Sequence, residues 1–214
     1  MCFSVTASYT AGAVLIGMGG VTLGLVRDRR ELAYAAIPLL FGVQQISEGL
    51  VWSFSGSDQV WLAVLASTVF SVFSHVIWPA YIPIATWLME PRPQRRRALG
   101  AIAVVGGLIA LYLLYSMIVV PITARISGGH VEYLSPHFYA AMTMTGYLLA
   151  TAVCLMVSSL RWVRVFGLLA GLSFAFAYAV YSTWFISVWC FFAALMSVVV
   201  LAHFLPERQL ERVS

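Results

Sequence analysis

A carboxylate and two amides stand inside an apolar stretch of the chain, at Gln44, Gln45 and Glu48, and Trp52 follows one helical turn later. Side chains three or four positions apart are neighbours on a helix, so a helix brings all four near one face. A charged side chain at the centre of a membrane helix costs about 2.5–3.5 kcal/mol on insertion scales, so such residues face the interior of a helix bundle. We therefore predict that these side chains bind a proton, a cation or a small polar ligand.

A second polar face follows further along the chain, on the next apolar segment. Its members recur at helical spacing and carry hydroxyl, imidazole and indole groups that can form hydrogen bonds with a ligand. They are Ser67, Ser71, Ser74, His75 and Trp78. Glu48 lies about 24 Å along its helix and His75 roughly 10–20 Å below the outer surface, so one cluster in the outer half of a membrane is sterically feasible.

Two prolines follow His75, and they predict an irregular helix. Pro79 has no amide hydrogen for the carbonyl of His75, and Pro83 has none for the carbonyl of Pro79. An unsatisfied carbonyl at membrane depth costs several kcal/mol, so each must find another donor. We predict a bend and a polar niche beside His75.

The predicted ligand-binding set draws on both faces, and the catalytic residues, if any, are unknown. The set comprises Gln44, Gln45, Glu48, Trp52, Ser71, His75 and Trp78. A zinc site with three protein ligands and one open position would need His75, Glu48 and a loop histidine, and no metal-binding motif signals it. The cofactor is also unknown, but retinal bound as a Schiff base is excluded because the chain has no lysine.

Composition places these residues in a membrane protein. The chain is 62% hydrophobic and 9% charged, with a mean hydropathy of +0.93, whereas soluble domains are about half apolar and a quarter charged. We predict an all-α bundle of seven transmembrane helices forming a single domain, residues 1–214. The expected spans are about 9–26, 32–54, 60–89, 98–120, 137–158, 165–181 and 184–204.

The basic residues predict the orientation in the membrane. All twelve are arginines, and eleven of them fall in four clusters, at 27–30, 92–97, 161–164 and 208–212. With seven spans, these four clusters lie on the same side of the membrane. Only Arg125 falls on the other side. The positive-inside rule then puts the N-terminus outside and the C-terminus in the cytoplasm. Short clusters between apolar runs form no basic stripe, so nucleic acid is not an expected partner.

Two local patterns predict details of packing. The loop 121–136 reads as two short strands, 122–126 and 131–134, about Gly128-Gly129, and an irregular loop is the alternative. The glycines of Gly20-x-x-x-Gly24 predict close approach of a neighbouring helix.

Three motifs carry a resemblance to a known group of proteins. They are the opening Met1-Cys2-Phe3-Ser4-x-x-Ala7-Ser8, the pattern Pro38-Leu-Leu-Phe-x-x-Gln44-Gln45-x-x-Glu48-Gly49-x-x-Trp52, and His75-x-x-Trp78-Pro79. Together they resemble an uncharacterised family of bacterial seven-span membrane proteins. The resemblance implies a multi-pass protein of the bacterial inner membrane and implies no activity.

Three functions remain open at this point. The first is binding or transport of a small ligand, proton or cation in an outer-half polar pocket. The second is a membrane-embedded, metal-assisted hydrolase acting on lipid. The third is a structural subunit of a larger membrane complex or homo-oligomer. The lipid bilayer is an expected partner in all three.

Overall fold

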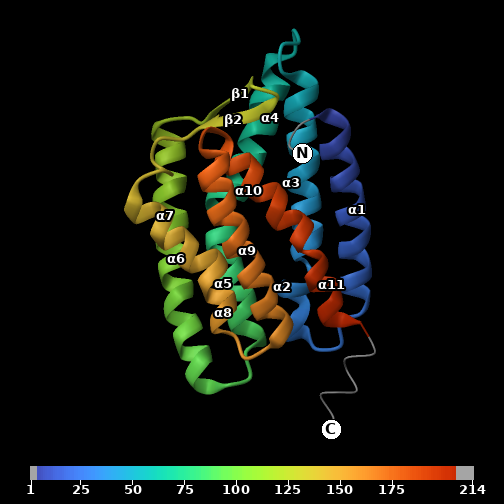
Figure 1. Ribbon diagram of the computed structural model, residues 1–214, viewed down its shortest axis with the longest axis vertical. Coiled ribbons are helices and arrows are strands. Elements are labelled where there is room, and N and C mark those ends of the chain that lie inside the picture. The colour runs from blue at the N-terminus through green and yellow to red at the C-terminus, as the bar shows by residue number, and fades with distance from the viewer. Residues whose placement is uncertain (1–3, 206–214) are drawn as a thin grey trace.

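The computed structural model describes residues 4–205, which form a bundle of roughly parallel helices with a two-stranded hairpin over one end (Figure 1). The opening up to Phe3, including Cys2, and the C-terminal stretch with Arg208 and Arg212 lie outside these residues.

The elements run along the chain in the following order. They are α1 (Val5–Gly24), η1 (Arg29–Glu31), α2 (Leu32–Ala35), α3 (Ile37–Phe54), α4 (Val60–Ser71), η2 (Val72–Ile77), α5 (Trp78–Met89), α6 (Pro93–Val119), β1 (Thr123–Ser127), β2 (His130–Leu134), α7 (Ala141–Leu148), η3 (Leu149–Val153), α8 (Cys154–Val157), α9 (Arg161–Val180), η4 (Ser182–Trp184), α10 (Phe185–Met196) and α11 (Val198–Phe204).

Several of the helices are long and apolar enough to cross a membrane. Five qualify, namely Val5–Gly24, Val60–Met89, Pro93–Val119, Arg161–Val180 and Ser182–Phe204, and Ala141–Val157 is a shorter apolar helix. The prediction of a mainly helical chain with several helices able to span a membrane is confirmed. The α6 helix starts at Pro93 rather than near residue 98, because proline is well tolerated in the first turn of a helix.

The segment expected at 32–54 consists of two helices rather than one. Helix α2 ends at Ala35, and Pro38 occupies the first turn of α3. The amide of a residue in the first turn has no helical acceptor, so a proline there removes no hydrogen bond. Pro38 therefore begins α3 and does not bend it. The last segment is likewise divided at Ser197, between α10 and α11.

The loop 121–136 forms the predicted hairpin, which adds two strands to the expected all-α fold. Strands β1 and β2 pair antiparallel from Thr123↔Leu134 to Ser127↔His130. Gly128 and Gly129 have φ angles of 57° and 77°, the left-handed region that glycine adopts at little cost. Across the strands, Arg125 donates two hydrogen bonds to the Glu132 carboxylate, at 2.8 and 3.1 Å.

The bundle has two chemically different ends. The loops at 25–31, 90–92 and 158–160 lie at one end together with their arginines, and the hairpin with Arg125 covers the other (Figure 1). We call these the arginine end and the hairpin end.

The glycines that allow close helix approach on α1 are not the predicted ones. A β-carbon on Gly20 or Gly24 would meet no atom within 4 Å, whereas one on Gly19 would lie 2.5 Å from the Leu39 backbone nitrogen. The prediction of Gly20-x-x-x-Gly24 as the contact face was wrong, because spacing identifies small residues without identifying which face packs against a partner.

Neighbouring glycines on α1 offer a matched test of this contact. Gly19→Ala should destabilise the protein by about 1–3 kcal/mol, the usual range for overpacking, because α1 must move away from α3. Gly20→Ala should leave the stability unchanged. Melting curves of the two variants in mild detergent would measure the difference, and equal melting temperatures would contradict the assigned face.

Candidate functional site

Helix α3 carries its two amide side chains and its carboxylate wholly into the bundle. Gln44, Gln45 and Glu48 each have 0% of their surface exposed. Oε1 of Gln44 accepts a hydrogen bond from Nε1 of Trp78 on α5 at 2.7 Å. Oε1 of Glu48 accepts one from Oγ of Ser187 on α10 at 2.6 Å. The polar face of α3 is therefore tied to two different helices.

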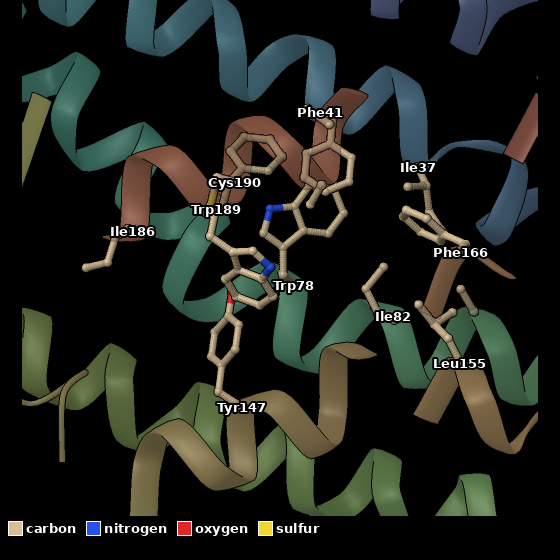
Figure 2. Packing of buried hydrophobic residues seen from close by; sticks show 14 of the residues in the cluster. Ile37, Phe41, Trp78, Ile82, Tyr147, Leu155, Phe166, Ile186, Trp189 and Cys190 are labelled. Carbon is tan, nitrogen blue, oxygen red and sulfur yellow. The ribbon is translucent and has the colours of Figure 1, made fainter. Parts of the chain in front are cut away.

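Aromatic side chains enclose this face. Trp78 stacks on Phe41 with 4.0 Å between ring centroids, and Figure 2 shows Trp78 pointing between Phe41 and Trp189. Beside them is a cavity of about 30 Å³ whose lining includes Trp78, Trp189, Tyr147 and Cys190. A water molecule needs about 10–15 Å³ of such space, together with polar partners.

Some polar atoms beside this cluster lack a protein partner within residues 4–205. They are Nε2 of Gln44, both amide atoms of Gln45 and Nε1 of Trp52. An unsatisfied buried polar group costs about 1–3 kcal/mol, and buried polar atoms in native proteins nearly always have a partner in protein or water. Nε2 of Gln44 and both amide atoms of Gln45 are thus available to a ligand.

The irregular helix predicted near Pro79 takes the form of a π-helical segment, η2. The amide of Trp78 bonds to the carbonyl of Phe73, five residues back. In this register Pro79 leaves the carbonyl of Ser74, rather than that of His75, without its helical donor. The hydroxyl of Tyr147 donates to that Ser74 carbonyl. A side chain from another helix therefore replaces the bond that the proline removes.

His75 points away from α3, toward the hairpin end. Its Nδ1 lies 3.1 Å from the Ser71 carbonyl oxygen and 2.8 Å from Oγ of Ser74. Its Nε2 lies 2.9 Å from Oγ of Ser135, in the loop that follows β2. The edge of its ring meets Phe138 at 5.0 Å between centroids. His75 is fully buried by these contacts.

The structure therefore separates the predicted set into two groups. Gln44 and Trp78 are in contact, while His75 and Ser71 belong to a second group under the hairpin. Glu48 was expected to lie within reach of a group on the segment that carries His75, and its Oε1 accepts a hydrogen bond from Ser187 on α10. Within the described part of the chain, no three His, Cys, Asp or Glu side chains are grouped so that they could hold a metal ion.

Sequence reasoning missed Ser187 and Ser135. Ser187 is a single hydroxyl in an apolar run, and its isolation is a weak signal for an inward-facing partner. Ser135 lies in a loop next to a proline and carries no pattern. Tyr147 belongs to a visible stripe with Thr143 and Thr151, but its contact with Ser74 depends on the π register.

Comparison with known proteins gives one match. Searches of curated proteins and of solved structures found no significant similarity. A family model described as a family of unknown function matches residues 1–213, which is almost the whole chain. The chain belongs to this family of unknown function, DUF6629.

Proposed function

We propose that this protein is a multi-pass protein of the bacterial inner membrane in which Gln44, Gln45 and Glu48 form a site for a proton or a small cation. The proposal includes seven spans, an outer N-terminus and a cytoplasmic C-terminus. The clustering of arginines at one end of the bundle supports this orientation. The apolar helices support the location in a membrane.

The observation that carries the proposal is the set of buried amide atoms on Gln44 and Gln45 that have no partner among the described residues. Apolar side chains at these positions would make the folded state more stable, because each unsatisfied buried polar atom costs free energy. Amide, carboxylate and hydroxyl oxygens, here from Gln45, Glu48 and Ser187, are the ligands that hard cations prefer. A small ion or a proton-bearing water would use these groups.

The size of the neighbouring cavity favours an ion over an organic molecule. Its 30 Å³ leaves no room for an organic molecule, and its lining is mainly apolar and includes none of Gln44, Gln45 and Glu48, so an ion would bind at those groups beside the cavity and not inside it. An organic ligand would need the helices to separate around Trp78 and Trp189. A proton or small cation needs no such movement, so it is the better supported ligand.

Infrared difference spectroscopy of the protein in lipid nanodiscs tests this proposal. The carboxyl band of Glu48 should change when the pH is lowered from neutral to mildly acidic, or when Na⁺ replaces a bulky organic cation. The change should vanish in Glu48→Gln and persist in Asp58→Asn, which alters an exposed carboxylate. A Glu48 band that responds to neither pH nor Na⁺ would show that the carboxyl serves only in packing.

A further inference from the structure

The contact between His75 and Ser135 has the arrangement of a nucleophile and its general base. Oγ of Ser135 and Nε2 of His75 are 2.9 Å apart, within the hydrogen-bond range that such pairs need. They come from distant parts of the chain, η2 and the loop after β2. The pair is separate from the site on α3, so it does not depend on the function proposed above.

The surroundings of His75 assign its tautomer. The Ser71 carbonyl, 3.1 Å from Nδ1, can only accept a hydrogen bond, so Nδ1 carries the proton. The hydroxyl of Ser74 donates to the same carbonyl at 3.3 Å and therefore offers its lone pair to Nδ1. Nε2 is then left with a lone pair directed at the Ser135 hydroxyl. This is the tautomer that a general base needs, and the Ser71 carbonyl is the third group, which orients the base.

Ser135 also borders space that a substrate could occupy. It lines a surface cavity of about 270 Å³ together with Tyr133, Leu134, Pro136 and Tyr139. Glu132, Ser182 and Thr183 complete the lining, so the cavity combines apolar surface with a few polar groups. The Glu132 carboxylate in this lining is paired with Arg125, so its charge is neutralised. The cavity lies at the hairpin end, and Leu134 beside it is 41% exposed.

We propose that Ser135 and His75 form a catalytic dyad that hydrolyses carboxylic esters with a short apolar acyl chain. Ser135 Oγ forms a bond to the ester carbonyl carbon as its proton passes to Nε2 of His75. The bond between that carbon and the alcohol oxygen breaks, and His75 returns the proton to the leaving alcohol. Water then attacks the acyl-serine with His75 as base, and this releases the acid and restores the Ser135 hydroxyl.

A fluorophosphonate with a short alkyl chain tests the dyad on the full-length protein in nanodiscs. Its phosphorus is attacked by an activated serine and fluoride leaves, so the adduct can be located by peptide mass spectrometry. We expect an adduct on Ser135 of the wild-type protein. The labelling rate should fall by about 10²-fold or more in His75→Gln, the lower end of what a general base contributes.

The controls separate this chemistry from a hydrogen bond that only anchors the hairpin. Ser135→Ala should lose the adduct, and Ser127→Ala, on β1 of the same hairpin, should keep it at the wild-type rate. Melting curves identify any variant that has unfolded, and the wild-type result stands without variants. Folded wild-type protein with no adduct on Ser135, or equal labelling of folded His75→Gln, would overturn the proposal.

Discussion

Gly106→Ala should destabilise the protein strongly, and Gly107→Ala next to it should not. A β-carbon on Gly106 would lie 2.0 Å from the carbonyl oxygen of Pro79, whereas one on Gly107 would meet nothing within 4 Å. The obstacle is backbone, which cannot rotate away as a side chain can. We expect a loss of about 3 kcal/mol, the upper part of the usual range for overpacking.

The reason for this close contact lies in the prolines of α5. Pro83 has no amide hydrogen, so the carbonyl of Pro79 makes no helical bond. Gly106 lets α6 approach this carbonyl directly, in the same way that small residues allow close helix contacts in membranes. The substitution would therefore push α6 away from the segment that holds His75.

Thermal unfolding in mild detergent, followed by the fraction of protein that stays monodisperse, would measure the effect. Gly107→Ala is the matched control because it adds the same methyl group one position along the same helix. Similar melting temperatures for both variants would show that α6 does not pack on Pro79 as described here.

The long apolar helices and the hairpin could be predicted from the sequence because both depend on local patterns. Apolar runs of sufficient length specify helices, and Gly128-Gly129 between two β-forming runs specifies a turn. The prolines also indicated that the helix would be irregular near His75, where η2 lies. The π register could not be predicted, because the hydroxyl of Tyr147, from a distant helix, satisfies the carbonyl that the register leaves free.

Only the part of the candidate site that lies on α3 could be predicted from the sequence. Burial of Gln44, Gln45 and Glu48 follows from the cost of polar groups facing lipid. Their partners depend on which helices are neighbours, and a single sequence does not contain that information. Spacing alone therefore suggested one cluster where the structure has two, and it left Ser135 out.

The last prediction concerns Glu90, which joins two loops at the arginine end. Glu90 is 2% exposed, and its Oε2 accepts hydrogen bonds from Oγ of Ser158 at 2.9 Å and from the Ser159 amide at 2.7 Å. Its Oε1 accepts from the Arg92 amide at 3.2 Å. Arg95 supports the same joint by donating to the carbonyls at the end of α8, at 3.0 and 2.7 Å.

Glu90→Gln should destabilise the protein by about 2–4 kcal/mol at neutral pH. Hydrogen bonds to a charged group are worth about 1.5–3 kcal/mol, and the NH₂ group of the glutamine would face hydrogen-bond donors where a carboxylate oxygen now accepts from them. Burial alone would raise the pKa of the Glu90 carboxyl, but the hydrogen bonds from Ser159, Arg92 and Ser158 outweigh it and hold the pKa below its usual value of 4.5. A lowered pKa means that the carboxylate stabilises the folded state fully above about 4.5 and loses this contribution as the pH falls through the folded-state pKa.

Melting temperatures of wild-type protein and Glu90→Gln across this pH range would test the prediction. The two should differ at neutral pH and converge in acid, since the wild-type carboxyl is then protonated like the neutral amide. Asp58→Asn, which changes an exposed carboxylate at the hairpin end, should match the wild type at every pH. A difference between Glu90→Gln and wild type that does not shrink in acid would mean that the shape of the side chain, and not its charge, holds the two loops together.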